Sequence, residues 1–262
     1  MLFAYYLILV FLKKIAVLLF YKKVFLLPMK KAILLHHAGG DKFAFDRLRK
    51  ILLPEIESIT VELPGRGERF GQPLLYDYKD VVADYFQQIK EHITTDYFLV
   101  GVSMGTMAAF ELCHFLLKEN LPLPTHLFLA ARLSPNSYKN EESIVGISSE
   151  EYWKIVKKYN GIPEQLLAHK ELVEFYEPIL RADFEVLEKY NKIEHQLEKI
   201  NLETLVIFGK EDTNNITLET AQSWSEHITQ PVIFKEFEGG HFFVYENEDV
   251  AAYIKSIVLD GK

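Results

Sequence analysis

The chain has one cysteine among 262 residues, and the lone Cys113 excludes both a disulfide framework and a multi-thiolate metal site. Positive charge is also scarce. The formal net charge of −8 argues against general nucleic-acid binding, which needs a basic face to displace counterions from phosphates. Internal repeats and Gly/Ser- or Pro-rich linkers are lacking as well. What remains, 49% hydrophobic and 25% charged residues, is the composition of a folded domain with a large core.

The first 28 residues differ from the rest. Residues 1–28 hold four lysines as their only charges, so a whole-chain charge of −8 leaves −12 for residues 29–262. The lysines divide this segment into apolar runs shorter than the ~20 residues that a spanning helix needs. Three interpretations stay open: a membrane-surface segment, a spanning helix that tolerates central lysines, and translated sequence upstream of a true start at Met29. The last is favoured, because Met29 directly precedes the first predicted core strand.

Short apolar runs alternate with stretches of helical spacing over residues 29–262. The runs predicted as buried strands are 32–36, 59–63, 97–102, 126–131, 204–208 and 232–234. The stretches predicted as helices are 78–93, 104–117, 217–228 and 249–258. This alternation predicts the α/β class, with a mostly parallel sheet flanked by helices on both faces.

One connection is too long for a simple crossover. Between Ala131 and Thr204 lie 72 residues without a convincing strand. Helical spacing within them predicts helices over 150–159, 163–170 and 179–190. We therefore expect a helical lid, at about residues 134–200, over one end of the sheet.

A serine lies in the pattern of a tight turn between a strand and a helix. Gly101-Val102-Ser103-Met104-Gly105 has the form G-x-S-x-G, the nucleophile elbow, in which flanking glycines relieve crowding. A predicted strand precedes it and a predicted helix follows it, which is the context that the motif requires. The alternative is an ordinary glycine-rich turn, and the residues described next favour the catalytic interpretation.

An elbow serine needs a base and an acid, because its hydroxyl is a weak nucleophile until a neighbouring group takes the proton. In this architecture the chain order is serine, acid, histidine, with acid and base on loops after later strands. Asp212 lies four residues beyond the predicted strand 204–208, and His241 follows the predicted strand 232–234. Both are predicted partners of Ser103. Glu211 is the nearest alternative acid, and a turn aspartate and a solvated loop histidine are the interpretations without catalysis.

The first predicted strand ends in His36-His37-Ala38-Gly39-Gly40. In such folds the loop after this strand donates one backbone N–H to an oxyanion hole, and the residue after the nucleophile donates the other. We predict Ala38 and Met104 as these donors. The alternative, a metal site at the paired histidines, is weak because adjacent residues of an extended chain point to opposite sides.

Five short motifs carry a resemblance to one enzyme family. They are His37-Ala38-Gly39-Gly40, Pro64-Gly65-Arg66 followed by Arg69, Gly101-Val102-Ser103-Met104-Gly105, Pro178-Ile179-Leu180-Arg181-Ala182-Asp183 and Gly239-Gly240-His241-Phe242-Phe243. In this order, from about Lys31 to Tyr253, they resemble the type II thioesterases of the α/β-hydrolase superfamily, the stand-alone editing enzymes of nonribosomal peptide and polyketide synthesis. The medium-chain fatty-acyl thioesterases belong to the same group. The sequence departs from the family pattern at His36, where proline is expected, and at Gly67.

The resemblance implies an α/β-hydrolase fold in which Ser103, Asp212 and His241 are the catalytic triad and the lid shapes the acyl pocket. It implies hydrolysis of acyl or aminoacyl thioesters on phosphopantetheine carrier proteins, which edits mis-primed or stalled carriers. A medium-chain fatty-acyl carrier thioesterase, a general carboxylesterase and a non-catalytic scaffold stay open as alternatives. No metal or redox cofactor is expected, and phosphopantetheine enters only as part of the carrier-bound substrate.

Acyl or peptidyl carrier domains are the partners that the resemblance implies. The protein is expected to be a monomer and to be located in the cytoplasm. Membrane association is expected only if residues 1–28 are real and retained. Because carrier proteins are generally acidic and residues 29–262 carry a net charge of −12, docking needs a local basic patch, for which the lysines of the expected lid are candidates. The alternative is that these lysines form a solvated helix face. The candidates for the patch are Lys154, Lys157, Lys158, Lys170 and Lys189. The motif residues Arg66, Arg69, Arg181 and Asp183 are interpreted as braces for loops and lid.

Overall fold

The computed structural model describes residues 29–138, 143–157 and 168–260. By internal contacts the chain divides into two units, Met1–Lys30 and Lys31–Lys262, and the sheet belongs to the second. The alternatives for residues 1–28 lie outside the described residues. Among the helices that the structure describes, none is long and apolar enough to cross a membrane.

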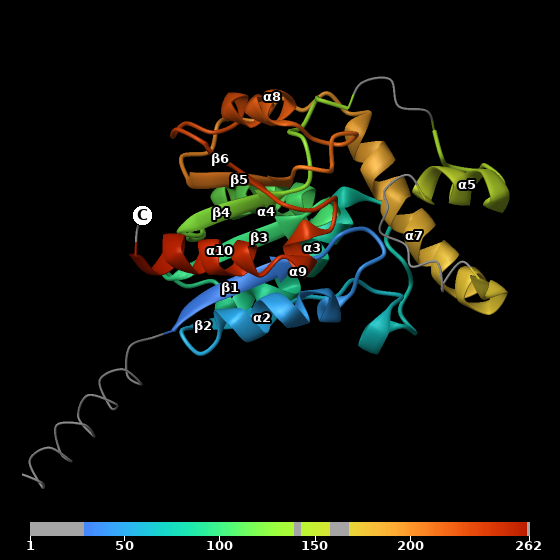
Figure 1. Cartoon of the computed structure of the whole chain (residues 1–262), viewed down its shortest axis with the longest axis horizontal. Helices are drawn as coiled ribbons and strands as arrows, with labels where there is room; N and C mark the ends of the chain where they lie inside the picture. Colours follow the sequence, from blue (N-terminus) through green and yellow to red (C-terminus); the bar gives the residue numbers. More distant parts are fainter. Residues whose placement is uncertain (1–28, 139–142, 158–167, 261–262) are drawn as a thin grey trace, which may run out of the picture. The chain divides into compact units, whose positions relative to one another are not determined.

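Six strands form one sheet in the order β2-β1-β3-β4-β5-β6 (Figure 1). β1 pairs in parallel with β3, and the parallel pairing continues from β3 through β4 and β5 to β6. The strands are β1 (Lys30–Leu35), β2 (Ile56–Thr60), β3 (Tyr97–Val102), β4 (His126–Ala130), β5 (Glu203–Gly209) and β6 (Ile233–Phe237). Because parallel neighbours end at the same edge, the loops after these strands gather there.

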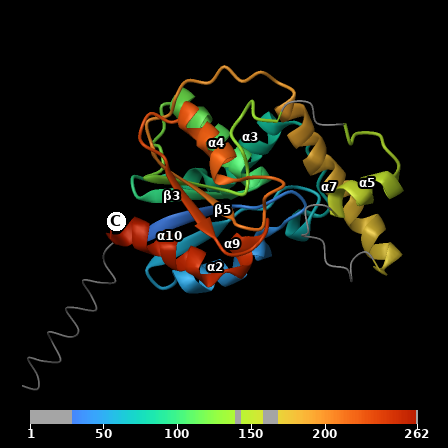
Figure 2. The same cartoon turned by 45° about the horizontal axis from the view of Figure 1, so that its top comes forward.

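Helices cover both faces of the sheet, as the α/β alternation predicted, and Figure 2 shows the sheet between two helical layers. α2 (Asp46–Leu52), α9 (Phe243–Glu246) and α10 (Glu248–Asp260) share one apolar cluster with alternate strand residues. α3 (Tyr78–Ile89) and α4 (Met104–Lys118) share the other. Every residue of β3 and β4 is buried, which explains why these strands read as continuous apolar runs rather than alternating ones.

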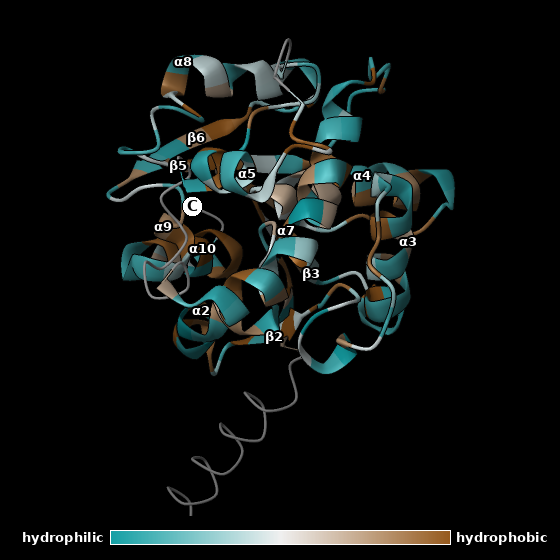
Figure 3. Cartoon of the chain, turned by 90° about the vertical axis from the view of Figure 1, so that its right-hand side faces the viewer, coloured by the Kyte–Doolittle hydropathy of each residue, from teal (hydrophilic) through white to brown (hydrophobic). Residues whose placement is uncertain are grey.

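The long connection between β4 and β5 contains two described helices, α5 (Ser149–Val156) and α7 (Lys170–Asn191). Tyr152, Trp153 and Val156 of α5 bury their side chains against Leu180 of α7 in a small cluster of their own. In Figure 3, which views the molecule from this side, both helices lie near the viewer and contain many hydrophilic residues, drawn in teal. We call this part, α5 and α7 with the described residues around them, the insertion.

Several predicted boundaries are wrong. The strand expected over 59–63 is β2, which ends at Thr60; Val61 and Leu63 are apolar because they are buried in the core, not because they pair in the sheet. The last strand, expected as a buried strand over 232–234, is β6 and ends at Phe237, the one residue of this edge strand that is buried.

The helices of the insertion also differ from expectation. α7 begins nine residues before the predicted 179, and Pro178 lies inside it rather than before its start. The helix expected over 150–159 is α5, which ends at Val156. The helix expected over 163–170 lies largely outside the described residues. The stretch expected as one helix over 217–228 is the short α8 (Leu218–Ala221) followed by a 3-10 turn at Gln222–Glu226.

Candidate active site

Ser103 occupies the turn between β3 and α4 with φ 53° and ψ −111°, a conformation that residues with a side chain rarely adopt. The turn is fixed by the N–H of Ser103, which donates to the carbonyl oxygen of Ala130 at 2.8 Å. The turn packs tightly on β1, so position 105 must be glycine: a Cβ there would lie 2.0 Å from the carbonyl oxygen of Leu35. The hydroxyl is therefore presented at the edge where the strands end.

The side chains of Ser103, His241 and Asp212 form one hydrogen-bonded chain. Nε2 of His241 lies 3.1 Å from Oγ of Ser103, and Nδ1 lies 2.7 Å from Oδ2 of Asp212. Because a carboxylate only accepts, the Nδ1 proton points to Asp212 and Nε2 presents its lone pair to the serine hydroxyl. The structure thus brings together three residues from the loops after β3, β5 and β6.

Asp212 and its neighbour Glu211 have different surroundings. Asp212 is 4% exposed, and Nδ2 of Asn215 donates to its Oδ1 at 2.5 Å. Glu211 is exposed, and its backbone N–H donates to Gly239. The acid next to the imidazole is therefore Asp212. Sequence reasoning missed Asn215, although an amide side chain three residues after an acid in the same turn is a signal for such a contact.

The two residues predicted as oxyanion donors lie close to this chain of side chains in the fold. Met104 is the first residue of α4, where backbone N–H groups have no acceptor within the helix. Ala38 lies in the loop after β1 and lines the same cavity as Ser103 and His241. The roles of both N–H groups stay predictions.

The adjacent histidines at the end of β1 have different neighbours. Nδ1 of His37 lies 2.8 Å from the hydroxyl of Tyr245, whereas Nε2 of His36 lies 3.4 Å from the hydroxyl of Tyr85. Burial, with a further contribution from Arg66, lowers the pKa of His36 to about 3. Burial, followed by His36, lowers the pKa of His37 to about 3 as well. Both imidazoles are therefore neutral near pH 7.

The paired histidines do not form a cluster with other ligands. Across the described ranges, no group of three or more His, Cys, Asp or Glu side chains is arranged to hold a metal ion. Cys113 is fully buried in the core, and burial raises the pKa of its thiol.

A cavity of about 510 Å³ extends from the Ser103 hydroxyl between the sheet edge and the insertion. The apolar side chains that the insertion contributes to its wall are Ile144, Ile155, Phe184 and Leu187. A polar part of the wall comes from Arg132, just after β4, whose guanidinium donates to Asn191 of α7 at 2.5 Å and lies 4.4 Å from the ring centre of Tyr138. The wall is therefore built jointly by the sheet edge and the insertion.

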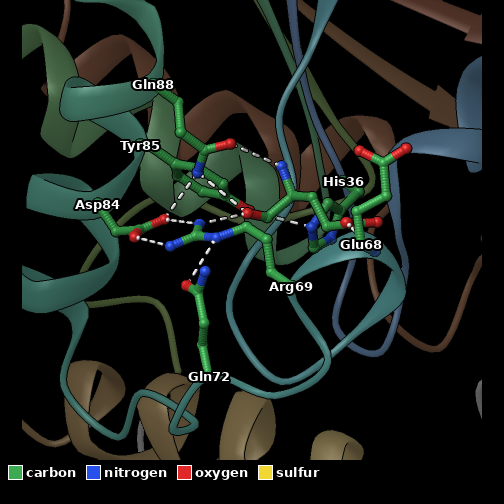
Figure 4. A network of polar contacts seen from close by, with 8 residues as sticks. His36, Glu68, Arg69, Gln72, Asp84, Tyr85 and Gln88 are labelled. Carbon is green, nitrogen blue, oxygen red and sulfur yellow. Dashed lines mark hydrogen bonds and ion pairs between the residues drawn. The ribbon is translucent and has the colours of Figure 1, made fainter.

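Two arginines of the five family motifs form bidentate ion pairs that join separate elements. Arg66, in the loop after β2, binds Asp183 of α7 with Nη–Oδ distances of 2.6 and 2.7 Å. Arg69 binds Asp84 of α3, at 2.7 Å for both contacts (Figure 4). Arg69 also donates to the carbonyl oxygen of Glu62, so this pair fastens the loop after β2 to α3. The bracing interpretation agrees with these contacts.

The charged side chains of the insertion are largely paired on their own helices. The pairs, four residues apart, are Lys154–Glu150, Lys170–Glu174, Lys189–Glu185, Arg181–Glu177 and, at the end of α7, Lys192–Glu188. Lys157 is exposed at the end of α5, and Lys158 lies outside the described residues. Three of the five candidate docking lysines therefore have a neighbouring carboxylate, which favours a solvated helix face.

Comparisons with known proteins agree on one family. Gramicidin S biosynthesis protein GrsT of Aneurinibacillus migulanus is 28% identical over 213 residues, which cover 81% of this chain and 82% of GrsT. The crystal structure of ClbQ from the colibactin NRPS/PKS pathway is 26% identical with a TM-score of 0.80 and covers 89% of this chain and 98% of ClbQ. The type II thioesterase BorB from the borrelidin biosynthetic cluster is 26% identical with a TM-score of 0.77 and covers 88% and 93%.

The family match covers most of the chain. Residues 31–258 match the family model described as Thioesterase domain, a range that contains the whole span over which the five motifs resemble the type II thioesterases. The parallel sheet with its flanking helices is shared with the solved thioesterases. The chain therefore belongs to the thioesterase family, with the fold of an α/β-hydrolase.

Proposed function

We propose that this protein hydrolyses acyl or aminoacyl thioesters on phosphopantetheine carrier proteins, with Ser103 as nucleophile, His241 as general base and Asp212 as its partner. One observation carries the proposal. In a chain of the thioesterase family, Oγ of Ser103 and Nε2 of His241 lie 3.1 Å apart, His241 is bound to Asp212 at 2.7 Å, and Ser103 and His241 line a cavity of about 510 Å³. This is the geometry of a serine activated by a base that a third group orients.

In the first half of the reaction, Oγ of Ser103 attacks the thioester carbonyl carbon while its proton passes to Nε2 of His241. Asp212 holds the imidazole by its Nδ1 proton and stabilises the positive charge that forms. Collapse of the tetrahedral intermediate breaks the C–S bond, and the proton on Nε2 goes to the departing sulfur. Because a thiol has a pKa of about 8.5, this leaving group needs less protonation than an amine does.

The second half releases the acid. A water molecule gives its proton to Nε2 of His241 and attacks the acyl-serine carbonyl, and the ester bond to Oγ breaks as the proton returns to Ser103. In both halves the carbonyl oxygen gains negative charge, and the N–H groups of Met104 and Ala38 bind it. None of these steps calls for a metal or a redox cofactor, and phosphopantetheine belongs to the substrate.

The choice of carrier-bound substrates rests on the relatives. ClbQ comes from an NRPS/PKS pathway, and BorB is a type II thioesterase from a biosynthetic cluster. Both cover nearly all of the thioesterase part of this chain. The carrier-bound substrates and the editing role that the resemblance to type II thioesterases implies are therefore proposed here. A medium-chain fatty-acyl carrier thioesterase and a general carboxylesterase remain the competing proposals, because they use the same three side chains.

The test is hydrolysis of acetyl, aminoacyl and decanoyl thioesters on one carrier protein by the full chain and by Ser103→Ala. We expect the full chain to turn over the short or aminoacyl thioesters. We expect Ser103→Ala to lower this turnover by about 10³-fold or more. Turnover confined to the decanoyl carrier would replace editing by the fatty-acyl proposal. A preference for simple esters over every carrier thioester would replace it by the carboxylesterase, and full activity of Ser103→Ala would contradict the nucleophile.

A further inference from the structure

Asp183 belongs to α7 of the insertion, yet its carboxylate binds the loop that follows β1. The backbone N–H of Gly39 donates to Oδ2 of Asp183 at 2.6 Å. The side chain is 2% exposed, so this contact lies in a part of the molecule from which water is largely excluded. A charged acceptor on a buried backbone N–H is among the stronger hydrogen bonds in a protein.

Arg66 completes the contact. Its guanidinium binds both carboxylate oxygens of Asp183, and its Nη1 also donates to the carbonyl oxygen of Gly40 at 3.2 Å. Burial alone would lower the pKa of Arg66, but Asp183 beside it raises that pKa above its ordinary value. One ion pair therefore holds the loop by an N–H at Gly39 and by a C=O at Gly40.

The helix also packs directly on the backbone of this loop. Gly39 has φ 76°, and a Cβ at Gly39 would lie 2.3 Å from Cδ2 of Leu180, which precedes Asp183 by one turn of α7. On the other side of Ala38, His37 is fastened to Tyr245 by a 2.8 Å contact between Nδ1 and the hydroxyl. The peptide of Ala38 is thus held between two anchored neighbours, His37 and Gly39.

We propose that Asp183 is a positioning residue for thioester hydrolysis: from the insertion, it fixes Gly39 and with it the direction of the Ala38 N–H toward the developing oxyanion. The inference rests on the proposed function and on Ala38 as a donor. A donor must lie close to the place that the oxyanion occupies, and a small rotation of its peptide removes much of its effect. The insertion therefore takes part in assembling the oxyanion hole in addition to lining the cavity.

The chain contains a matched control for this idea. Arg69 and Asp84 form the same bidentate ion pair, with both contacts at 2.7 Å, but their further contacts are to Gln72, Gln88 and the carbonyl oxygen of Glu62 (Figure 4). This second pair fastens the loop after β2 to α3 rather than to the loop that holds Ala38. A substitution of Asp84 therefore removes an ion pair of the same chemistry without releasing Gly39.

The experiment compares Asp183→Asn with Asp84→Asn in the full chain. Asp183→Asn should lower kcat on an acetyl carrier by about 10- to 100-fold and change KM less than threefold, because a displaced donor acts mainly in the transition state. A trifluoromethyl ketone analogue of acetyl-pantetheine, whose carbonyl carbon bonds to Oγ of Ser103 and whose carbonyl oxygen becomes the oxyanion, should lose affinity by a similar factor. Asp84→Asn should change neither quantity by more than about threefold, and Asp183→Glu should recover part of kcat.

Two results would overturn the inference. One is an Asp183→Asn protein whose kcat and analogue affinity equal those of Asp84→Asn. The other is a loss of analogue affinity no greater than the loss of ground-state substrate affinity, which a merely structural role would produce. If Asp183→Asn does not fold, Asp183→Glu gives the reading instead, because it keeps the negative charge beside Arg66 but moves the carboxylate that accepts the Gly39 N–H. An inactive wild-type protein would contradict the proposed function instead, so the two failures are distinguishable.

Discussion

The sheet edge and the insertion contribute to one cavity in different ways. The sheet edge supplies Ser103, Asp212 and His241 from loops that directly follow paired strands of the sheet, so backbone pairing sets their positions. α7 reaches the same cavity through side chains: Asp183 binds the loop after β1, and Phe184 lines the wall. Changes at the sheet edge should therefore act on the bond-making steps, whereas changes in the insertion should act on geometry and to a smaller extent.

After the loss of the nucleophile itself, the largest effect expected within this comparison is that of Asp212→Asn at the sheet edge. Its amide cannot hold the proton on Nδ1 of His241 as a carboxylate does, so kcat on an acyl carrier should fall by on the order of 10⁴-fold. Glu211→Gln is the matched control, because Glu211 is the adjacent acid and is exposed. Steady-state kinetics of both variants decide between them. Equal losses would remove Asp212 from its proposed role.

Acid should lower the unfolding free energy of the chain through His36 and His37, which lie at the sheet edge after β1. Both have a pKa of about 3 in the folded chain, against an ordinary value of 6.5. As pH falls below 6.5 the unfolded chain takes up two protons that the folded chain refuses, so stability present above pH 6.5 is lost progressively toward pH 3. At pH 5 each histidine should account for about 2 kcal/mol of lost unfolding free energy.

Urea titrations at pH 7 and pH 5 measure that loss, and carboxylates contribute to it as well. The decisive quantity is therefore the difference between the wild type and a His36→Gln, His37→Gln double variant, whose unfolding free energy should fall about 4 kcal/mol less between the two pH values. An identical pH response in the double variant would show that these imidazoles are not neutral in the folded chain.

A smaller effect is expected where the two regions touch. Gly39→Ala places a methyl group against Leu180 at a φ of 76°, whereas Gly146→Ala places one at a φ of 79° with no atom within 4 Å. Both variants should lose roughly 1 kcal/mol to the backbone conformation, and Gly39→Ala should lose a further ~1 to 3 kcal/mol and part of its kcat. Thermal unfolding and kinetics of the pair test this, and equal stabilities would contradict a tight contact between loop and helix.

The smallest effect belongs to an aromatic pair on the surface. Phe70, after β2, and Phe175, on α7, stack with ring centres 5.1 Å apart and are 57% and 44% exposed. A double-mutant cycle with Phe70→Ala and Phe175→Ala should give a coupling of about 0.5 kcal/mol in unfolding free energy and leave the acid response unchanged. Additive effects would mean that the stacking adds nothing to the attachment of α7.

What could be predicted from the sequence follows the same division. The elbow around Ser103 has a local pattern, strand then glycine-flanked turn then helix. Asp212 follows the buried apolar strand β5, and His241 follows β6, of which only Phe237 is buried. Such signals lie within a few neighbouring residues, so sequence alone could select the three side chains that the structure brings together. The order of the strands in the sheet could not be predicted, because pairing partners leave no trace in a single strand's pattern.

The contacts of the insertion could not be predicted in this way. Gly39 and Asp183 are 144 residues apart, and neither has a local pattern that names the other. The motif resemblance singled out Asp183 and Arg66 without indicating that they form a pair. The predicted start of α7 was wrong because of Pro178. Proline is disfavoured inside a helix, but the packing of this long amphipathic helix outweighs that preference.

The strand order has a consequence for a chain that is still being synthesised. β6 is an edge strand, the last made, and His241 follows it, whereas Ser103 follows β3 in the middle of the sheet. A nascent chain that extends only to the loop after β5 can already present the serine and Asp212 but has no imidazole to place between them. Because His241 comes after the last strand in the chain, the ability to cleave a thioester arises only when the C-terminal segment has been made and has docked at the sheet edge. Recovery of activity on refolding therefore requires β6 to be paired with β5, whichever part of the sheet forms first.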